Sequence, residues 1–226
     1  MRPYVICHMY TSIDGKIDGE YMEEGGCDIS GEFYDDVIFQ MGTSMAGGRV
    51  TSQLYNATGK NCLDSYSPDS IPEGDFFLFA QHYQFCFDRM GKCFYEDEKY
   101  VYGGKQMQIV EVISSKCDPR YRAYLRNNKI AYIIADTIEA ALEKIYDIFH
   151  VRYLVLTGGA TINGGFLKEN CIDEISLVVA PYIEGNAKYQ QFVGNLDHFI
   201  KQKFLFSKAN PLKDGGVQLI FQKEKK

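Results

Sequence analysis

The chain has 226 residues, of which 46% are hydrophobic and 24% charged, and these ordinary globular proportions argue against disorder. Its 24 Lys and Arg against 30 Asp and Glu give a net charge of −6 without a basic run, so we expect no nucleic-acid partner. The sequence has no apolar stretch near the ~20 residues that a membrane span needs and no secretory pattern, so we expect neither a membrane association nor export.

The first half of the chain contains apolar runs that predict strands and one segment that predicts a helix. The expected strands are residues 4–9, 76–80 and 109–114, and the expected helix is residues 31–45. A continuous apolar run such as 4–9 is typical of a strand that is buried on both faces of a parallel sheet. The stretch 82–107 combines many aromatic residues with Gly103 and Gly104, and we interpret it as an inserted hairpin or lid.

Strands and helices alternate more clearly in the second half. The expected strands are residues 130–135, 153–157 and 175–180, and the expected helices are residues 137–149 and 161–170. Asp136 to Glu139 have the pattern of a capping box, in which the Asp side chain accepts from the backbone and Glu139 reaches back. The β-α-β-α-β order predicts an α/β protein with a mainly parallel sheet.

The end of the chain changes character. Residues 203–208 and 217–222 alternate in polarity on either side of Asp214-Gly215-Gly216, which predicts a hairpin of antiparallel strands. Because there is neither an internal repeat nor a flexible linker, we expect a single domain over residues 1–226.

The cysteines and histidines give no disulfide or metal pattern. The cysteines are Cys7, Cys27, Cys62, Cys86, Cys93, Cys117 and Cys171. Their number is odd, no two of them form a C-x-x-C pair, and the four histidines are far apart. Disulfide frameworks and zinc ribbons need closer, regular spacing. We therefore expect mostly reduced thiols, a cytoplasmic location and no metal site.

The most informative segment runs from Thr157 to Gly165, where an apolar strand meets paired glycines and then an expected helix. Glycines let the backbone approach a ligand closely, and a helix start offers free N–H groups and the positive end of the helix dipole. These features suit a phosphate or pyrophosphate at the carboxyl edge of the sheet. A tight turn with no ligand is the alternative. The spacing matches neither the dinucleotide-binding fingerprint nor the P-loop.

Two further segments could contribute polar groups to a site. Arg49, beside Gly47 and Gly48, could hold an anion through its planar guanidinium, although a surface arginine in a turn is the more common outcome. Asp14 and Lys16 follow the first strand, together with hydroxyl side chains, and could bind a polar substrate or move a proton. A plain turn at Asp14 explains the local chemistry equally well.

In their order along the chain, these segments resemble the reductase domain of the riboflavin-biosynthesis pyrimidine reductase family, which has a dihydrofolate-reductase-like fold. The motifs that carry the resemblance are Ser12-Ile-Asp-Gly-Lys16, Gly48-Arg-Val-Thr51, Leu156-Thr-Gly-Gly-Ala-Thr161, Asp173-Glu-Ile-Ser-Leu-Val-Val-Ala-Pro181 with Gly185, and Gly215-Gly-Val-Gln-Leu219. The resemblance implies a three-layer α/β sandwich, with a mainly parallel central sheet and a C-terminal antiparallel hairpin.

The resemblance also implies an activity. Enzymes of this family transfer a hydride from NADPH to the ribosyl group of a 5-amino-6-(5-phosphoribosylamino)uracil-like pyrimidine, and a homodimer is expected. The sequence has no H-x-E and no P-C-x-x-C, so we expect no deaminase domain. Two alternatives stay open: a reductase of a folate or another heterocycle, and a non-catalytic nucleotide-binding protein on the same fold.

Carried over by position, the resemblance implies roles for individual residues. The cofactor's phosphates would contact Gly158, Gly159, Ala160, Thr161, Ile162, Asn163, Gly164 and Gly165. A second cofactor-binding corner would consist of Gly48, Arg49 and Thr51, with Arg49 on the adenosine-side phosphate. Tyr10 and Thr11 would lie near the nicotinamide. Asp14 and Thr157 would face the substrate, and Asp14 or Lys16 could supply the proton.

Overall fold

The protein is described here by a computed structural model, which covers residues 1–23, 28–68 and 71–225. Its contacts divide the chain into two compact units. The first unit consists of Met1–Pro3 and Thr43–Arg152, and the second of Tyr4–Gly42 and Tyr153–Lys226. Cys27 lies outside the described residues, whereas the six other cysteines have free thiols, as predicted.

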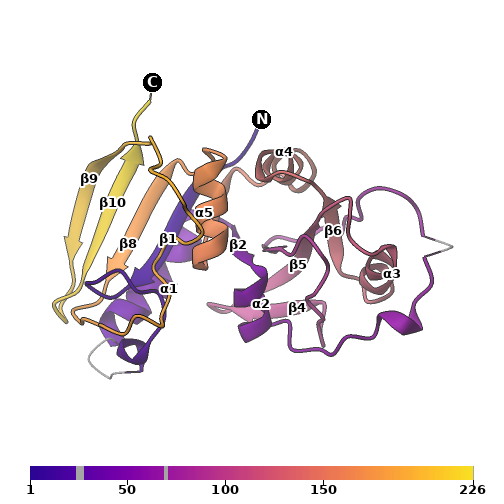
Figure 1. The fold of residues 1–226 in the computed structure, drawn as a ribbon, viewed down its shortest axis with the longest axis horizontal. Helices are drawn as coiled ribbons and strands as arrows, with labels where there is room; N and C mark the ends of the chain where they lie inside the picture. The colour runs from indigo at the N-terminus through magenta and orange to yellow at the C-terminus, as the bar shows by residue number, and fades with distance from the viewer. Residues whose placement is uncertain (24–27, 69–70, 226) are drawn as a thin grey trace. The chain divides into compact units, whose positions relative to one another are not determined.

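The second unit contains a sheet that is parallel at one side and antiparallel at the other (Figure 1). Its strands, in spatial order, are β7 (Tyr153–Leu156), β1 (Tyr4–Thr11), β8 (Glu174–Val179), β10 (Val217–Lys223) and β9 (Phe204–Pro211). β1 pairs in parallel with β7 and β8, whereas β10 is antiparallel to both β8 and β9. Both the buried first strand and the C-terminal hairpin are therefore confirmed.

Helices α1 (Asp28–Met41) and α5 (Ala160–Lys168) lie on opposite faces of this sheet (Figure 1). Successive side chains of a strand point to opposite faces, so neighbours on β1 identify the helix on each side. His8 stacks on Tyr34 of α1 with ring centroids 4.5 Å apart. Met9 lies against Gly158, just before α5. The second unit thus has the predicted helix–sheet–helix layering; a 3-10 turn, η1 (Glu20–Met22), precedes α1.

The strands of the first unit pair mainly in parallel. Its strands are β2 (Ser44–Gly48), β3 (Tyr83–Phe87), β4 (Lys99–Tyr102), β5 (Lys105–Ile113) and β6 (Ala131–Ile134). β3 lies between β2 and β5 and is parallel to both. β4 pairs antiparallel with the first half of β5, and β6 pairs in parallel with its second half. Together with the second unit, this confirms the α/β class with a mostly parallel sheet.

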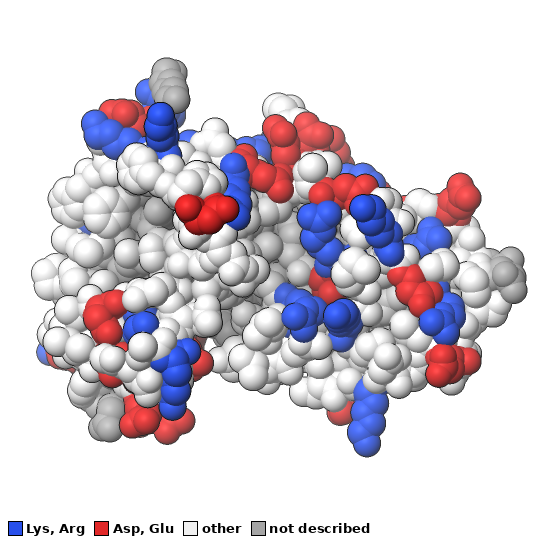
Figure 2. Space-filling view, viewed as in Figure 1, with Lys and Arg blue, Asp and Glu red and all other residues white. Residues whose placement is uncertain are grey.

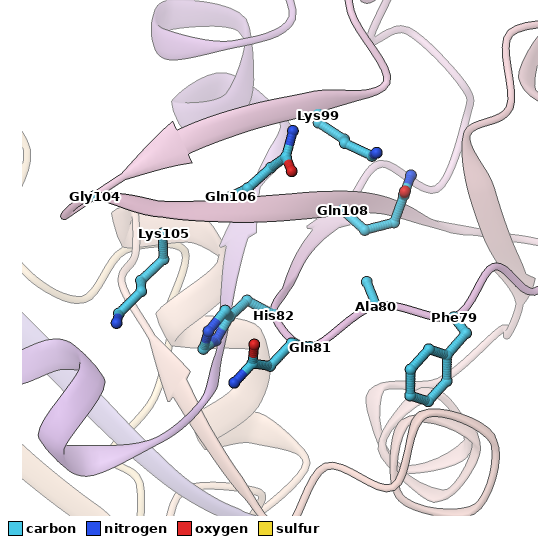
Figure 3. Close-up of a pocket in the computed structure, with 9 residues that line it drawn as sticks. All are labelled: Phe79, Ala80, Gln81, His82, Lys99, Gly104, Lys105, Gln106 and Gln108. Atoms are coloured by element: carbon cyan, nitrogen blue, oxygen red, sulfur yellow. The ribbon is translucent and has the colours of Figure 1, made fainter.

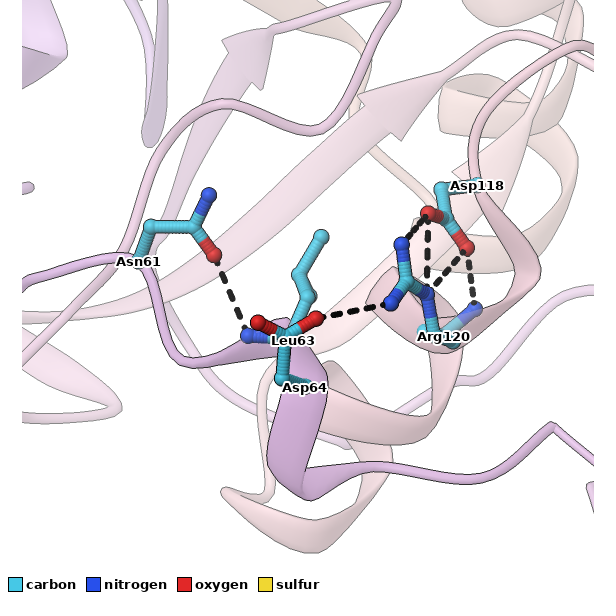
Figure 4. Close-up of polar contacts among 5 residues, drawn as sticks. All are labelled: Asn61, Leu63, Asp64, Asp118 and Arg120. Atoms are coloured by element: carbon cyan, nitrogen blue, oxygen red, sulfur yellow. Dashed lines mark hydrogen bonds and ion pairs between the residues drawn. The ribbon is translucent and has the colours of Figure 1, made fainter.

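The helical elements of the first unit are α2 (Arg49–Tyr55), η3 (Leu63–Ser65), α3 (Pro119–Asn127) and α4 (Ile138–Phe149). α3 was not predicted from the sequence, although it begins with a strong local signal. Asp118 caps it by accepting from the Arg120 amide at 2.9 Å, and Pro119 occupies the first turn. The Arg120 guanidinium also reaches Asp64 of η3 at 3.0 Å, which ties η3 to α3 (Figure 4).

The predicted helix at residues 31–45 was wrong at its end, because the helix stops at Met41 and Ser44 begins a strand. Gly42 explains the stop. A Cβ on Gly42 would lie 2.7 Å from the Tyr153 carbonyl oxygen, so the chain leaves the helix in close contact with another backbone. β2 was not predicted because its residues, apart from Met45, are small and form no apolar run.

The predicted strand at residues 76–80 was also wrong, since the structure has only a single bridge there, between Phe76 and Tyr132. The strand is Tyr83–Phe87 instead, so the first part of 82–107 belongs to the core and is not an insertion. This strand was not predicted because the buried polar residue Gln84 interrupts its apolar pattern. Gln84 Oε1 accepts a hydrogen bond from the Tyr100 hydroxyl at 3.1 Å. The hairpin interpretation holds for the later part, where β4 and β5 meet at Gly103 and Gly104.

The predicted cap of α4 was wrong by one residue. Thr137 is the cap, and its hydroxyl accepts from the Ala140 amide at 3.1 Å. Asp136 instead accepts from the Ser115 amide at 3.0 Å and from the Ser115 hydroxyl at 2.7 Å. The carboxylate therefore joins two loops of the first unit rather than opening the helix.

The surface has charges of both signs. On the face shown in Figure 2, acidic and basic side chains are interspersed and neither sign dominates. None of the helices in the described part of the chain has the length and apolar character needed to cross a membrane.

Candidate active site

The residues predicted for the site divide between the two units. The second unit carries Tyr10, Thr11, Asp14, Lys16 and all of residues 157–165, whereas the first carries Gly48, Arg49 and Thr51.

The turn between β7 and α5 has a backbone that only glycine accommodates well. Gly158 has φ +94°, and a Cβ on it would lie 2.8 Å from Cε of Met9. Gly159 precedes the first helical residue and adds no side chain over it, while the next residue, Ala160, is small. The start of α5 is therefore lined by main chain rather than by side chains. This cradle fits a phosphate group, which binds to the free N–H groups of a helix start.

Asn163 and Gly164, on the first turns of α5, are both buried. A Cβ on Gly164 would lie only 2.0 Å from the Gly194 carbonyl oxygen, so this glycine allows the 192–194 segment to pack on the helix. Asn163 Nδ2 donates to the Phe192 carbonyl at 2.8 Å, but its buried Oδ1 has no partner among the described residues. An unpaired acceptor calls for an O–H or N–H donor, which a ribose hydroxyl or a carboxamide supplies.

Asp14 is held by its own loop and by a distant one. Its Oδ1 accepts from the Ser12 hydroxyl at 2.7 Å and from the Glu184 amide at 2.9 Å, and its Oδ2 accepts from the Gly185 amide at 3.0 Å. These hydrogen bonds lower the pKa of Asp14 to about 2, and the one from Ser12 has the largest effect. Asp14 is therefore an ionised clamp that has no proton to donate near neutral pH.

The hydrogen bonds of ionised Asp14 predict that the stability of the chain depends on pH. Since the pKa of Asp14 is lower in the folded chain than its ordinary 3.8, its stabilising effect is complete above that value and is lost as pH falls toward about 2. We expect Asp14→Asn to melt below wild type at neutral pH, with the gap closing between about pH 4 and pH 2. Thermal melts of both proteins across that range test this. A gap that stays constant with pH would contradict it.

Lys16 lies on the same loop but is almost fully buried. Its Nζ donates to the Tyr189 carbonyl at 2.9 Å, and its amide donates to the Ser12 hydroxyl at 3.0 Å. This hydrogen bond uses one of the three N–H groups of the Lys16 side chain and leaves two others. The role of Lys16 as a proton donor stays a prediction.

Tyr10 and Thr11 end β1 and are both buried. The Tyr10 ring packs between Tyr21 and Tyr34, with centroids 5.6 Å and 6.0 Å away. Thr157, directly after β7, is half-buried. The predicted contacts of these residues with nicotinamide and substrate stay predictions.

In the first unit, Gly48 ends β2 and Arg49 begins α2, so the predicted turn is the start of a short helix. The Arg49 Nη1 donates to Gln53 Oε1 one helical turn later, at 2.7 Å. This leaves other N–H groups of the guanidinium to contact an anion.

A hollow of about 420 Å³ also occurs in the first unit, beside the β4–β5 hairpin (Figure 3). It is lined by Phe79, Ala80, Gln81, His82, Lys99, Gly104, Lys105, Gln106 and Gln108. None of the predicted site residues lines it, so it is separate from the site that the motifs indicate.

With this geometry in hand, comparison with known proteins decides the family. Residues 3–203 match the RibD C-terminal domain. The chain belongs to that family. The predicted family is therefore confirmed, and with it the enzyme class: the chain is an oxidoreductase of the riboflavin-biosynthesis pyrimidine reductase type.

Solved structures share the fold of this RibD-family chain at low sequence identity. A pyrimidine reductase-like protein from Corynebacterium diphtheriae is 11% identical with a TM-score of 0.70, over 99% of this chain and 93% of the other. The riboflavin biosynthesis reductase Rib7 of Saccharomyces cerevisiae is 10% identical with a TM-score of 0.57, over 99% and 90%. RibD from Acinetobacter baumannii is 14% identical with a TM-score of 0.63, over 99% of this chain but only 58% of that protein.

The partners that hold the loop of Asp14 and Lys16 were not predicted from the sequence. Glu184, whose amide binds Asp14, is 170 positions away in sequence, and Tyr189 is 173 positions from Lys16. No local pattern marks either residue, because both act through backbone groups. Of the residues that bind Asp14 and Lys16 from this distant segment, Gly185 alone belongs to a motif that carries the family resemblance.

Proposed function

We propose that the chain is an NADPH-dependent reductase of a 5-amino-6-(5-phosphoribosylamino)uracil-like pyrimidine in riboflavin biosynthesis. The observation that carries this proposal is the main-chain cradle at Gly158 and Gly159 in a member of the RibD C-terminal domain family. When bound, NADPH would supply the hydride for reduction of the ribosyl group. The chain's own residues would bind, orient and supply a proton.

Each group of predicted residues would contact a different part of the cofactor. The start of α5, from Gly158 to Thr161, would receive the diphosphate, with Ile162 and Gly165 on the same helix beside it. The orphaned Oδ1 of Asn163 would accept from a hydroxyl or amide of the cofactor. In the first unit, Arg49 would contact the phosphate that distinguishes NADPH from NADH, next to Gly48 and Thr51.

The loop after β1 would bind the substrate and supply the proton. Asp14 holds this loop against Glu184 and Gly185, and Lys16 would donate the proton that completes the reduction. Placing the nicotinamide and the substrate carbon in contact can lower the barrier by several kcal/mol. Tyr10, Thr11 and Thr157 would line this region.

Titration of the purified chain with NADPH, followed by turnover assays, tests the proposal. We expect saturable NADPH binding and NADPH oxidation with the phosphoribosylamino-pyrimidine, but not with dihydrofolate. Turnover of dihydrofolate alone would favour a folate-type reductase, and cofactor binding without turnover of either substrate would favour a non-catalytic nucleotide-binding protein. Absence of saturable binding at submillimolar NADPH would contradict the proposal.

Arg49→Ala tests the cofactor preference. We expect the variant to weaken NADPH binding by about tenfold or more, as loss of a charge-assisted contact costs ~1.5–3 kcal/mol, while NADH binding changes little. Isothermal titration with both cofactors measures this, and NADH serves as the internal control. An equal loss for both cofactors would remove Arg49 from this role.

The partners we propose are this small heterocyclic substrate and a second copy of the chain in the cytoplasm, without nucleic acid. Exposed apolar side chains on the outer strand β9, Leu205 and Phe206, support a homodimer. Sedimentation velocity distinguishes a dimer from a monomer.

A further inference from the structure

A second cluster of reactive side chains lies in the core of the first unit, separate from the residues proposed above for catalysis. Cys86 on β3, Cys93 in the loop that follows and Glu111 on β5 each have 0% of their surface exposed. Their ligand atoms, two sulfurs and a carboxylate oxygen, all lie within 4.8 Å of one another. The cysteine spacing does not predict this cluster, because its members come from three separate segments.

The sulfur separation matches a shared metal ion better than a covalent bond. Cys86 Sγ and Cys93 Sγ are 3.7 Å apart, far beyond the ~2.05 Å of a disulfide. Two thiolates that each lie ~2.3 Å from a tetrahedral zinc ion are ~3.8 Å from one another. The two cysteines thus already have the spacing of zinc ligands.

The carboxylate needs a positively charged or proton-bearing partner. Glu111 Oε1 accepts a hydrogen bond from the Tyr95 hydroxyl, but the buried Oε2 has no partner among the described residues. None of the ion pairs found in the described part of the chain includes Glu111. An ionised carboxylate without a partner in such a place is costly, so Glu111 must either keep a proton or bind a cation.

We propose that Cys86, Cys93 and Glu111 bind a zinc-class divalent cation in the core of the first unit. Two thiolates and a carboxylate form a donor set of the kind that zinc takes in proteins. Tyr95, whose hydroxyl is bonded to Glu111, is the candidate fourth ligand or holds the carboxylate in place. Binding releases the two thiol protons and the carboxyl proton.

The site has a structural role. Cys93 Sγ lies 3.8 Å from the carbonyl oxygen of Arg49, the first residue of α2. The Cys93 amide donates to Asp88 at 2.7 Å, which fixes the loop that carries this sulfur. A cation at the cluster would therefore join β3, β5 and this loop beneath the start of α2. Because the cluster is fully buried, the cation would enter as the chain folds.

Metal analysis of the full chain tests the proposal. The protein is produced in zinc-supplemented medium, purified under reducing conditions, dialysed against a weak chelator and analysed by plasma mass spectrometry. We expect about one zinc per chain in the wild type. Cys86→Ser, Cys93→Ser and Glu111→Gln should each lower zinc affinity by more than about 100-fold, since even partners outside the ligand set cost 10–100-fold. Cys117→Ser, which removes a buried thiol of the same core outside the cluster, should keep the zinc.

A cobalt experiment covers variants that fail to fold. The wild type and the Cys117→Ser variant, refolded with Co²⁺, should show thiolate-to-cobalt charge-transfer absorption and the visible bands of tetrahedral cobalt. The proposal would be overturned if the wild type contained no more zinc than the buffer and also showed no such absorption with Co²⁺. So would variants of Cys86, Cys93 or Glu111 that bind zinc as tightly as the wild type.

Discussion

Gly164→Ala is expected to destabilise the chain by about 3 kcal/mol, the upper part of the range for overpacking a well-filled site. The added Cβ would lie 2.0 Å from the Gly194 carbonyl oxygen, and neither backbone can move without unpacking α5 from the 192–194 segment. The Gly194 amide also donates to the Ala160 carbonyl at 2.9 Å, so the same shift would disturb the first residue of the helix. Denaturant unfolding monitored by circular dichroism measures the change in free energy.

Gly31→Ala is the matched control, because Gly31 is also a helical glycine of the second unit. A Cβ at this position meets nothing within 4 Å. The substitution should therefore stabilise the chain by about 0.5–1 kcal/mol, which is the helix preference of alanine over glycine. The two substitutions are expected to change the free energy of unfolding in opposite directions. A Gly164→Ala protein as stable as the wild type would show that α5 does not pack on Gly194 as described.

Lys16→Met is expected to lower kcat by about 10²–10⁴-fold, the typical contribution of a positioned proton donor. Asp14 cannot take over this role, because hydrogen bonds lower its pKa to about 2 and keep it ionised. Methionine retains much of the length and apolar stem of lysine but carries no proton. NADPH affinity should change little, so the loss should fall on kcat rather than on cofactor binding. Steady-state kinetics together with an NADPH titration separate the two effects.

Lys188→Met provides the control for a general loss of positive charge near this loop. Lys188 is exposed, with its Nζ 4.5 Å from the centroid of the Tyr189 ring, whereas Lys16 donates to the Tyr189 carbonyl. We expect Lys188→Met to keep kcat near that of the wild type. If Lys16→Met folds normally and also keeps its kcat, the proton comes from another group.

Local patterns in the sequence were sufficient for several elements that carry their own signal, although α3 was missed despite its Asp118-Pro119 start. The apolar run at residues 4–9 identified the central strand β1, and Asp214-Gly215-Gly216 identified the hairpin of β9 and β10. The order of strands and helices after residue 130 gave the α/β class. In each of these cases the signal and the structure that it produces lie within a few residues.

Elements without such a signal were missed. β2 consists of small residues apart from Met45, and β3 contains a buried glutamine whose partner, Tyr100, lies 16 positions away. The glycine turn at Gly158 could be placed from sequence, but the packing of Gly194 on Gly164 and the hydrogen bonds of Asp14 to Glu184 depend on contacts over 30 and 170 positions. Glu111 lies within an apolar run, and only the fold brings Cys86 and Cys93 beside it.

Isotope transfer tests whether the hydride passes from NADPH to the ribosyl group of the pyrimidine. The chain is incubated with the phosphoribosylamino-pyrimidine and NADPH that carries deuterium at the 4-position of the nicotinamide, in separate reactions for the two faces of the ring. We expect one of the two reactions to yield a ribityl product that is one mass unit heavier by mass spectrometry. NADPH oxidation that leaves the product unlabelled in both reactions, or no product at all, would contradict it.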